Sequence, residues 1–324
     1  MTDQTPKRLR LVFAGTPQVA IPSLDALVAA GRDGADHTIA AVISREDAPL
    51  GRKRVLTPSP VARRAAELGL HTIKANRLDD AVTAEVGRLS PDLGVIVAYG
   101  GLVREPLLST PRLGWINLHF SLLPRWRGAA PVQRTIMAGD TISGASVFQL
   151  VPALDAGSVF QTISQPIDPD ETAGELLSRL AVTGASMLAR TVQDIANGRA
   201  DPTEQHGEVT LAPKLTIDDA RLHWDQPDDA VYNRLRAVTP EPGAFTEISL
   251  DGSESARLKI MKARRTTGES RLRPGTFTNR SGHVLVGTAT HPLELLSVQP
   301  AGRREMAAVD WWRGLTHSAE VIAR

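Results

Sequence analysis

The chain is 324 residues long, with a formal net charge of +1, 42% hydrophobic residues and no cysteine. This profile is that of a globular protein with room for two domains, and it excludes disulfides, thiolate metal sites and cysteine nucleophiles. No apolar run reaches the roughly 18 residues that a membrane span needs, the polar N-terminus lacks a signal-peptide core, and the missing cysteines suit a reducing cytoplasm.

The first two hundred residues alternate between strand-like and helix-like patterns. The apolar run Leu9–Ala14 ends at Gly15 and predicts a buried strand, after which Pro17 opens a helical pattern through Ala29. Further strands are predicted at Thr38–Ile43, Leu70–Ile73, Leu93–Ala98, Trp115–His119, Ala145–Leu150 and Val159–Ile167. Helices are predicted at Pro60–Leu68, Asp79–Leu89, Val103–Leu108, Pro131–Ala138 and Thr172–Asn197. The alternation predicts an α/β fold with a Rossmann-like, doubly wound, mainly parallel sheet.

The turn after the first strand does not favour a dinucleotide site. It contains one glycine, Gly15, where the dinucleotide fingerprint needs three. A tight strand-to-helix turn explains this glycine, so neither a nicotinamide nor a flavin cofactor is expected.

The pattern changes after residue 198. Residues 199–214 are polar and lack apolar periodicity, which predicts a linker between a catalytic domain over 1–198 and a second domain over 215–324. The second part has a helical pattern at Asp228–Val238. Its short strand candidates are Ala244–Ser249, Arg257–Ala263, Gly275–Thr278, His283–Val286 and Leu293–Val298. Short strands with turns between them favour a small β-barrel.

The strand Trp115–His119 carries two polar side chains on one face. Asn117 and His119 are two positions apart, so they point to the same side of the sheet, at a carboxyl end where open α/β sheets bind ligands. With Asp155, they could supply an oxyanion donor, a general base and a carboxylate that orients the base. Taken singly, His119 also fits a core histidine and Asp155 a turn residue. A metal site is not favoured, because no second ligand stands at ligand spacing near His119.

Motifs along the whole chain resemble the folate-dependent formyltransferase superfamily. They are Phe13–Pro17, Gly51-Arg52, Thr57–Val61, Val97–Gly100, Asn117–Gln133, Leu154–Gly157, Lys214-Leu215 and Leu296–Gly302. Within that superfamily the chain is similar to members that act on an aminoacyl-tRNA. The resemblance implies transfer of a formyl group from 10-formyltetrahydrofolate to the free amino group of methionyl-initiator-tRNA, for translation initiation.

The same resemblance implies the parts of the site. Asn117, His119 and Asp155 would be catalytic, no metal would take part, and the second domain would be an OB-like barrel. The expected folate contacts are Ser121, Leu122, Leu123, Pro124, Val97, Ala98 and Tyr99. Irregular backbone there could pair with the pterin edge, although without the resemblance Leu122 and Leu123 also fit an ordinary core.

Two basic segments stand out from the neutral chain. Ser44–Arg64 contains six basic and two acidic residues, and Arg257–Arg304 contains ten basic and two acidic residues. Such runs often form solvated surfaces, but phosphate contacts would use them as well. The resemblance places the first segment at the tRNA acceptor arm and implies tRNA contacts by Arg52, Lys53, Arg54 and Lys214.

Other functions remain open at this point. A formyltransferase for a small amine, a hydrolase that releases formate from the same donor, and a nucleic-acid-binding barrel on an inactive enzyme all fit parts of the sequence. The first alternative has no need for the basic segments, and the last conflicts with the intact Asn117, His119 and Asp155. A monomer without a membrane partner is expected.

Overall fold

The computed structural model describes residues 8–51, 53–250, 255–315 and 321–323. The chain divides into two compact units. Unit 1 comprises Met1–Pro131, Ser143–Gln165 and Leu177–Ala212, and unit 2 comprises Val132–Ile142, Pro166–Leu176 and Pro213–Arg324. Both units are discontinuous in sequence, because short segments of the first two hundred residues belong to unit 2.

Unit 1 is built on a seven-stranded sheet with the order β10-β9-β7-β6-β1-β2-β5. The strands are β1 (Leu9–Gly15), β2 (His37–Ser44), β5 (Thr72–Lys74), β6 (Leu93–Val97), β7 (Trp115–His119), β9 (Ile142–Gln149) and β10 (Val159–Pro166). The pairs β1–β2, β1–β6, β2–β5 and β6–β7 are parallel, whereas β9 runs antiparallel to β7. The predicted Rossmann-like, mainly parallel sheet is therefore confirmed.

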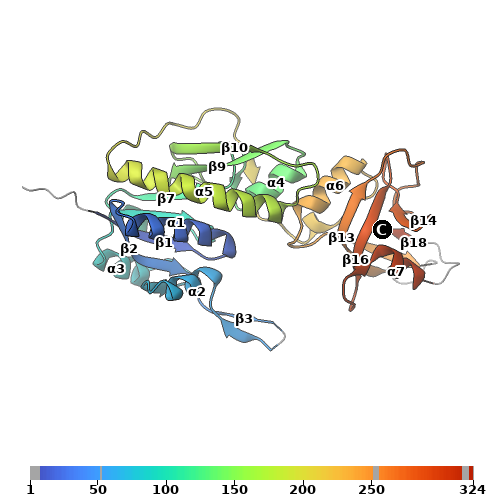
Figure 1. Ribbon diagram of the computed structural model, residues 1–324, viewed down its shortest axis with the longest axis horizontal. Helices are drawn as coiled ribbons and strands as arrows, with labels where there is room; N and C mark the ends of the chain where they lie inside the picture. Colours follow the sequence, from blue (N-terminus) through green and yellow to red (C-terminus); the bar gives the residue numbers. More distant parts are fainter. Residues whose placement is uncertain (1–7, 52, 251–254, 316–320, 324) are drawn as a thin grey trace, which may run out of the picture. The chain divides into compact units, whose positions relative to one another are not determined.

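Helices cover both faces of this sheet (Figure 1). They are α1 (Ile21–Arg32), α2 (Pro60–Glu67), α3 (Asp80–Arg88) and α5 (Ala173–Ala196). Val82 and Val86 of α3 share a buried cluster with Trp115, whereas a Cβ added to Gly184 of α5 would lie 3.1 Å from Leu118. Leu118 thus faces α5. The residues that alternate with Leu118 along β7, among them Asn117 and His119, face the other side of the sheet.

One local prediction is wrong, and one segment without a predicted element forms two short strands. The helix predicted at Val103–Leu108 is absent from the described chain, where a short 3-10 turn, Leu107–Ser109, replaces it. Pro106 explains this difference, because proline restricts the residue before it and lacks an N–H donor.

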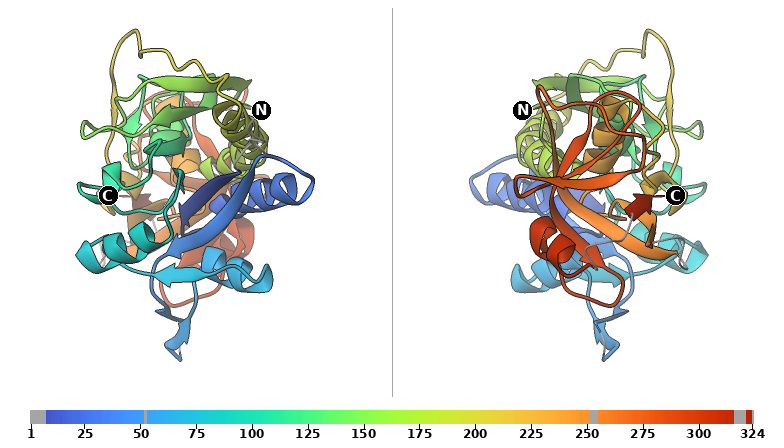
Figure 2. Two further views of the ribbon diagram at one scale, coloured as in Figure 1. Left: turned by 90° about the vertical axis from the view of Figure 1, so that its left-hand side faces the viewer. Right: turned by 90° about the vertical axis from the view of Figure 1, so that its right-hand side faces the viewer.

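The first basic segment forms a hairpin of β3 (Ala48–Leu50) and β4 (Val55–Thr57), which projects from unit 1 (Figure 1; Figure 2).

Unit 2 contains an antiparallel sheet with the order β14-β15-β16-β13-β12-β18, and β17 pairs with β16. Its strands are β12 (Phe245–Leu250), β13 (Ala256–Arg265), β14 (Phe277–Arg280), β15 (His283–Val286), β16 (Leu293–Pro300), β17 (Met306–Ala307) and β18 (Val321–Ala323). The right-hand view of Figure 2 shows how these strands curve. In the described chain, Thr276, which directly precedes β14, forms one isolated bridge with Ile322 of β18, and no ladder joins these two strands. Among the described residues the second domain is therefore an antiparallel sheet and not the closed barrel that was predicted.

Three α-helices of the described chain complete unit 2: α4 (Pro131–Met137), which belongs to it from Val132 onward, α6 (Asp228–Ala237) and α7 (Ala308–Arg313). Arg134 of α4 donates to both carboxylate oxygens of Asp219, at 2.8 and 3.1 Å. Burial acts to raise the pKa of Asp219, but bonds from Arg134 and Thr216 outweigh it and hold the pKa at about 2. Trp311 of α7 is buried, with its ring edge-to-face on Phe277 at 5.8 Å.

Unit 1 buries a histidine with an incomplete set of partners. His37 is fully buried; its Nε2 lies 2.9 Å from the Leu27 carbonyl, and its Nδ1 has no hydrogen-bond partner in the described chain. Burial lowers the pKa of His37 below its ordinary 6.5, although the Leu27 carbonyl and Asp36 act in the opposite direction. The folded state therefore binds fewer protons than the unfolded state near that pH.

This histidine predicts an acid-sensitive stability. The stability that neutral His37 contributes is present above the unfolded pKa and is lost as the pH falls through that value toward the folded pKa. We expect wild-type protein to lose more stability between about pH 7.5 and about pH 5.5 than a His37→Gln variant. Urea unfolding at both pH values tests this, with His71→Gln at an exposed position as control. An equal pH dependence of wild type and His37→Gln would contradict it.

Candidate active site

The polar residues predicted as a site lie at one edge of the unit 1 sheet. Strands β1, β2, β6 and β7 are parallel, so their carboxyl ends meet at this edge. Asn117 is in register with Ile96 of β6 and with Phe148 of β9, and His119 is in register with Ser146. The strand Trp115–His119 has the predicted bounds, so Asn117 and His119 share one face.

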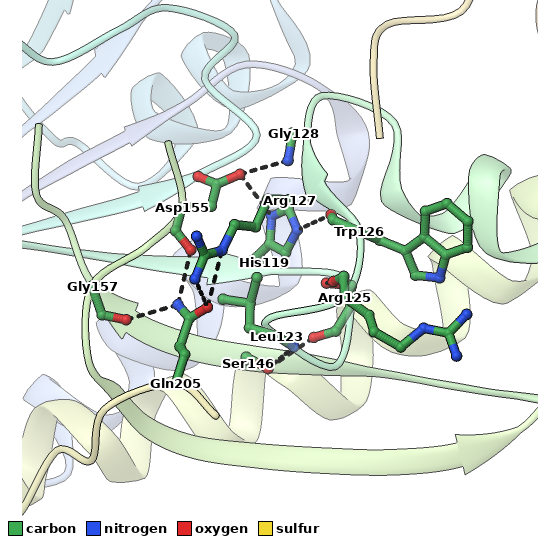
Figure 3. A network of polar contacts seen from close by, with 11 residues as sticks. His119, Leu123, Arg125, Trp126, Arg127, Gly128, Ser146, Asp155, Gly157 and Gln205 are labelled. Carbon is green, nitrogen blue, oxygen red and sulfur yellow. Dashed lines mark hydrogen bonds and ion pairs between the residues drawn. The ribbon is translucent and has the colours of Figure 1, made fainter. Parts of the chain in front are cut away.

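His119 is held on both sides of its ring (Figure 3). Its Nε2 lies 2.9 Å from the Trp126 carbonyl oxygen, and because a carbonyl only accepts, Nε2 carries a proton and donates. The other nitrogen, Nδ1, lies 3.9 Å from Asp155 Oδ2. In the neutral ring Nδ1 therefore bears the free lone pair, and it faces a carboxylate.

Burial dominates the electrostatics of His119. The residue is 6% exposed, and burial lowers the pKa of His119 below its ordinary 6.5, while the Asp155 carboxylate and the Trp126 carbonyl act to raise it. Such a ring is neutral near pH 7 and can accept a proton. Asp155 supplies the charge that stabilises the protonated form.

Asp155 comes from the loop between β9 and β10 and has a left-handed backbone, with φ of 46°. Its Oδ2 accepts a hydrogen bond of 2.7 Å from the Gly128 N–H, so the carboxylate is fixed by the segment whose Trp126 carbonyl also binds His119. Left-handed backbone at a residue other than glycine is costly and is concentrated at functional sites. Ala98 and Trp126 share this conformation, with φ of 49° and 62°.

Asn117 is half-buried on the same strand face. Among the residues that the structure describes, none forms a hydrogen bond with its side chain, whereas His119 and Asp155 both have partners. An amide without a protein partner keeps both donor hydrogens for a ligand. The arrangement thus combines a base, a carboxylate and an open N–H donor.

The predicted folate contacts border this group. The loop that holds Ser121, Leu122, Leu123 and Pro124 is braced from within, because Ser121 Oγ donates to the Arg125 carbonyl at 2.7 Å and Ser146 Oγ donates to the Ser121 carbonyl at 2.8 Å. Leu122 and Leu123 are half-buried. They can therefore form an apolar wall without being part of a closed core.

The loop after β6, with Val97, Ala98 and Tyr99, lies at the same sheet edge. Tyr99 is buried, its hydroxyl donates to the Ala75 carbonyl at 2.6 Å, and its carbonyl accepts from Thr16 Oγ1 at 3.0 Å. Ala98 is exposed. The loop is thus held by Tyr99, while Ala98 beside it is open to solvent.

The predicted tRNA contacts are less concentrated. Lys53 and Arg54 are exposed in the turn between β3 and β4, whose flanking residues Leu50 and Leu56 are 66% and 67% exposed. Arg52 lies outside the described residues. Lys214 is exposed in unit 2.

The second basic segment is partly neutralised within unit 2. Four of its ten basic side chains form ion pairs with carboxylates, namely Arg257–Glu247, Arg264–Glu294, Arg265–Asp229 and Arg280–Glu269. The pairs reduce the charge that an external phosphate would meet. The segment is therefore less basic at its surface than its composition implies.

Sequence reasoning missed several residues of the site. Trp126, Gly128 and Gln205 contact His119 or the Asp155 loop, and Arg127 contacts Gln205. Of these residues, Gly128 has a type that the sequence could have used, because only glycine fits there: its φ is 130°, and an added Cβ would lie 2.6 Å from the Ala212 carbonyl.

In the described part of the chain, no three His, Asp or Glu residues are grouped as for a metal.

Comparison with protein families gives one assignment for each part of the chain. A profile described as formyl transferase matches residues 9–192, and a profile described as formyl transferase, C-terminal domain, matches residues 214–316. The first match contains Asn117, His119 and Asp155.

Curated relatives match over almost the whole chain. A methionyl-tRNA formyltransferase from Clavibacter sepedonicus is 57% identical over 316 residues, which are 98% of this chain and 100% of the relative. A methionyl-tRNA formyltransferase from Leifsonia xyli subsp. xyli is 60% identical over 306 residues, which are 94% of this chain and 97% of the relative.

Solved structures share the fold at low identity. One is an N-formyltransferase from Helicobacter canadensis in complex with folinic acid and dTDP-3-aminofucose, with a TM-score of 0.65, 17% identity, and coverage of 90% of this chain and 99% of that chain. Another is HypX from Aquifex aeolicus in complex with tetrahydrofolic acid, with a TM-score of 0.58, 17% identity, and coverage of 94% and 47%.

Proposed function

The chain belongs to the formyl transferase family, and on that premise we propose that it transfers a formyl group from 10-formyltetrahydrofolate to the amino group of methionyl-initiator-tRNA. The observation that carries the proposal is the 57% identity to a methionyl-tRNA formyltransferase over 98% of this chain. The paired His119 and Asp155, with Asn117 beside them, supply the chemistry that this reaction needs.

His119 acts as the general base in this proposal. Its Nε2 proton is engaged by the Trp126 carbonyl, so Nδ1 takes the proton that the attacking amine loses as the new C–N bond forms. Asp155, 3.9 Å from Nδ1, stabilises the imidazolium, which then returns the proton to the departing nitrogen. The proton balance closes, because one proton leaves the amine and one reaches the leaving group.

Asn117 stabilises the negative charge that develops on the formyl oxygen. Its side-chain N–H groups have no partner within the described chain, and they lie on the face of β7 that carries His119. A fixed N–H donor is worth about 3 kcal/mol in comparable acyl-transfer sites. In the donor, the formyl group is bonded to the nitrogen that leaves. The side-chain amide of Asn117 keeps the formyl oxygen aligned during the transfer.

The surroundings fit a folate co-substrate. Half-buried Leu122 and Leu123 offer apolar contact, and the loops through Ser121–Pro124 and Val97–Tyr99 border the same edge. Their irregular backbone provides N–H and C=O groups for the pterin, with specificity from few polar contacts. We assign these residues to the folate pocket.

The basic residues are proposed to bind tRNA. Lys53 and Arg54 stand exposed on the β3–β4 hairpin, and Lys214 is exposed in unit 2. Lys and Arg side chains contact phosphate in a salt-dependent way, and an arginine fork can also bind a base edge. We propose that Arg52 contacts the acceptor arm and that residues 215–324 form the tRNA-binding domain.

A formylation assay tests the function directly. Purified protein, 10-formyltetrahydrofolate and methionyl-initiator-tRNA should yield N-formylmethionyl-tRNA, with the rate falling steeply as salt is raised. Uncharged initiator tRNA is the matched negative control, because it keeps every phosphate and lacks the amine. Formate release without transfer would indicate a hydrolase, and transfer only to a small amine would indicate a different acceptor.

The cell compartment and the oligomeric state of the enzyme are also proposed. A chain without cysteine suits the reducing cytoplasm, where aminoacyl-tRNA and folate are available. None of the described helices is long and apolar enough to span a membrane. We propose that the enzyme acts there as a monomer, which gel filtration with light scattering would check.

A further inference from the structure

The polar segment after residue 198 is attached to the active site. We call residues 203–212 the strap. Thr203 pairs with Val159, Thr210 Oγ1 accepts from the Trp126 N–H at 2.9 Å, and the Thr210 carbonyl accepts from the Arg127 N–H at 2.9 Å. The strap ends as β11 (Leu211–Ala212), which runs parallel to β8 (Arg127–Gly128). All of these residues belong to unit 1.

Gln205 of the strap uses its whole side-chain amide at this site (Figure 3). Its Nε2 donates to the Asp155 carbonyl and to the Gly157 carbonyl, both at 2.8 Å. Its Oε1 accepts from Arg127, at 3.1 Å from Nε and 2.6 Å from Nη2. One side chain thus ties the Asp155 loop to the segment that binds both His119 and the Asp155 carboxylate.

We propose that Gln205 is a positioning residue for the formyl transfer, and that it holds the Asp155 loop so that the carboxylate faces His119. The inference rests on the proposed function, because it assigns Gln205 a part in that reaction. The hydrogen bonds of the Gln205 side chain reach the Asp155 and Gly157 carbonyls and Arg127, so Gln205 acts through the backbone of the loop.

The Asp155 loop needs such support. Residues 150–158 contain no helix or strand, Leu154 is 53% exposed, and Asp155 has φ of 46°. A left-handed backbone is unfavourable for aspartate and persists only where the surroundings fix it. Gln205 binds the carbonyls of Asp155 and Gly157, and so fixes the peptide planes on the C-terminal side of Asp155.

Only an amide of this length satisfies all four contacts. Two acceptor carbonyls lie on one side and two donor groups of Arg127 on the other. Glutamate would lose both donors and place its charge against two carbonyl oxygens, and lysine would lose the acceptor and repel Arg127. Alanine would leave the carbonyls and the guanidinium without this partner.

The position of Asp155 controls the charge near His119. Asp155 is the charged side chain that acts to raise the pKa of His119, against the effect of burial. Arg127 is the other charged group of this cluster, and Gln205 engages its guanidinium. If Asp155 moves away, the pKa of His119 falls further. His119, the proposed general base, is then protonated only at lower pH.

The test compares Gln205→Ala and Gln205→Glu with wild type in the full chain. We expect kcat to fall by about tenfold to a hundredfold, as for small displacements of catalytic groups, with KM for both substrates changed less than about twofold. The acid limb of the kcat/KM profile should move to lower pH. Gln165→Ala is the matched control, because Gln165 Oε1 also accepts from an arginine, Arg179 Nη1 at 2.6 Å.

The outcomes separate this inference from the proposed function. Wild-type protein that fails to formylate methionyl-tRNA refutes the proposed function before any variant is compared. Active wild type with unchanged kcat and pH profile in both Gln205 variants overturns the positioning role alone. An equal loss of kcat in Gln165→Ala would also overturn the positioning role. So would a loss of kcat in the Gln205 variants that comes with a lower melting temperature while the acid limb of the kcat/KM profile stays in place.

Discussion

Replacing His119 with alanine is expected to lower the rate of formyl transfer to methionyl-tRNA by about a hundredfold to ten-thousandfold. The ring is 6% exposed, and its Nδ1 is the one basic nitrogen that faces Asp155. Without it, no imidazole stands at this position to take the amine proton. In the proposed donor pocket the folate contacts come from backbone and apolar groups of other residues, so folate binding should change little.

Single-turnover formylation and equilibrium folate binding, measured on the same preparation, check this expectation. His71→Ala, at an exposed position of unit 1, is the matched control and should keep wild-type activity. Near-normal turnover by folded His119→Ala protein would remove His119 from the catalytic group. A loss of folate binding equal to the loss of turnover would assign the ring to binding instead.

Replacing Asp155 with asparagine should lower kcat by up to about ten-thousandfold, as in other sites where a carboxylate serves a histidine. Asparagine keeps an oxygen that can accept from the Gly128 N–H, so the loop retains its bond of 2.7 Å while the charge is lost. The protonated His119 then lacks the carboxylate that stabilises it. The effect is electrostatic and should appear without a large loss of stability.

The pH profile distinguishes this effect from a structural one. Asp155 acts to raise the pKa of His119, so its neutralisation should lower that pKa. The acid limb of the pH profile of the remaining activity should then move to lower pH. Asp194→Asn is a suitable control, because Asp194 also lies in unit 1 and forms its ion pair, at 3.6 Å, with Arg199. A shift to higher pH in Asp155→Asn would contradict the assigned role.

The parts of the fold that the sequence predicted depend on local patterns. The bounds of β7 and β15 were predicted without error, because turn residues flank each of these short strands. The 3-10 turn at Leu107–Ser109 was missed because the apolar spacing outweighed Pro106 in the prediction. The β3–β4 hairpin was missed because three-residue strands leave almost no periodicity.

The active site was predictable only where its residues are close in sequence or match a family motif. Asn117 and His119 follow from strand alternation. Asp155 reaches His119 through a loop whose path no local rule gives, and the resemblance supplied it. Gln205 lies 50 residues from Asp155 in a polar stretch, and its role depends on the path of the strap.

The division of the chain into units also constrains the order of folding during synthesis. From Val132 onward helix α4 belongs to unit 2, and its Met137 packs against the buried cluster of that unit, whose members lie between Ala220 and Val321. Arg134 finds its carboxylate only at Asp219, 85 residues later. Because the ribosome releases the N-terminal part first, Arg134 and Met137 must wait for these partners until the last third of the chain has emerged. A nascent chain stalled near residue 200 should therefore leave residues 131–137 more accessible to protease than the full-length chain does.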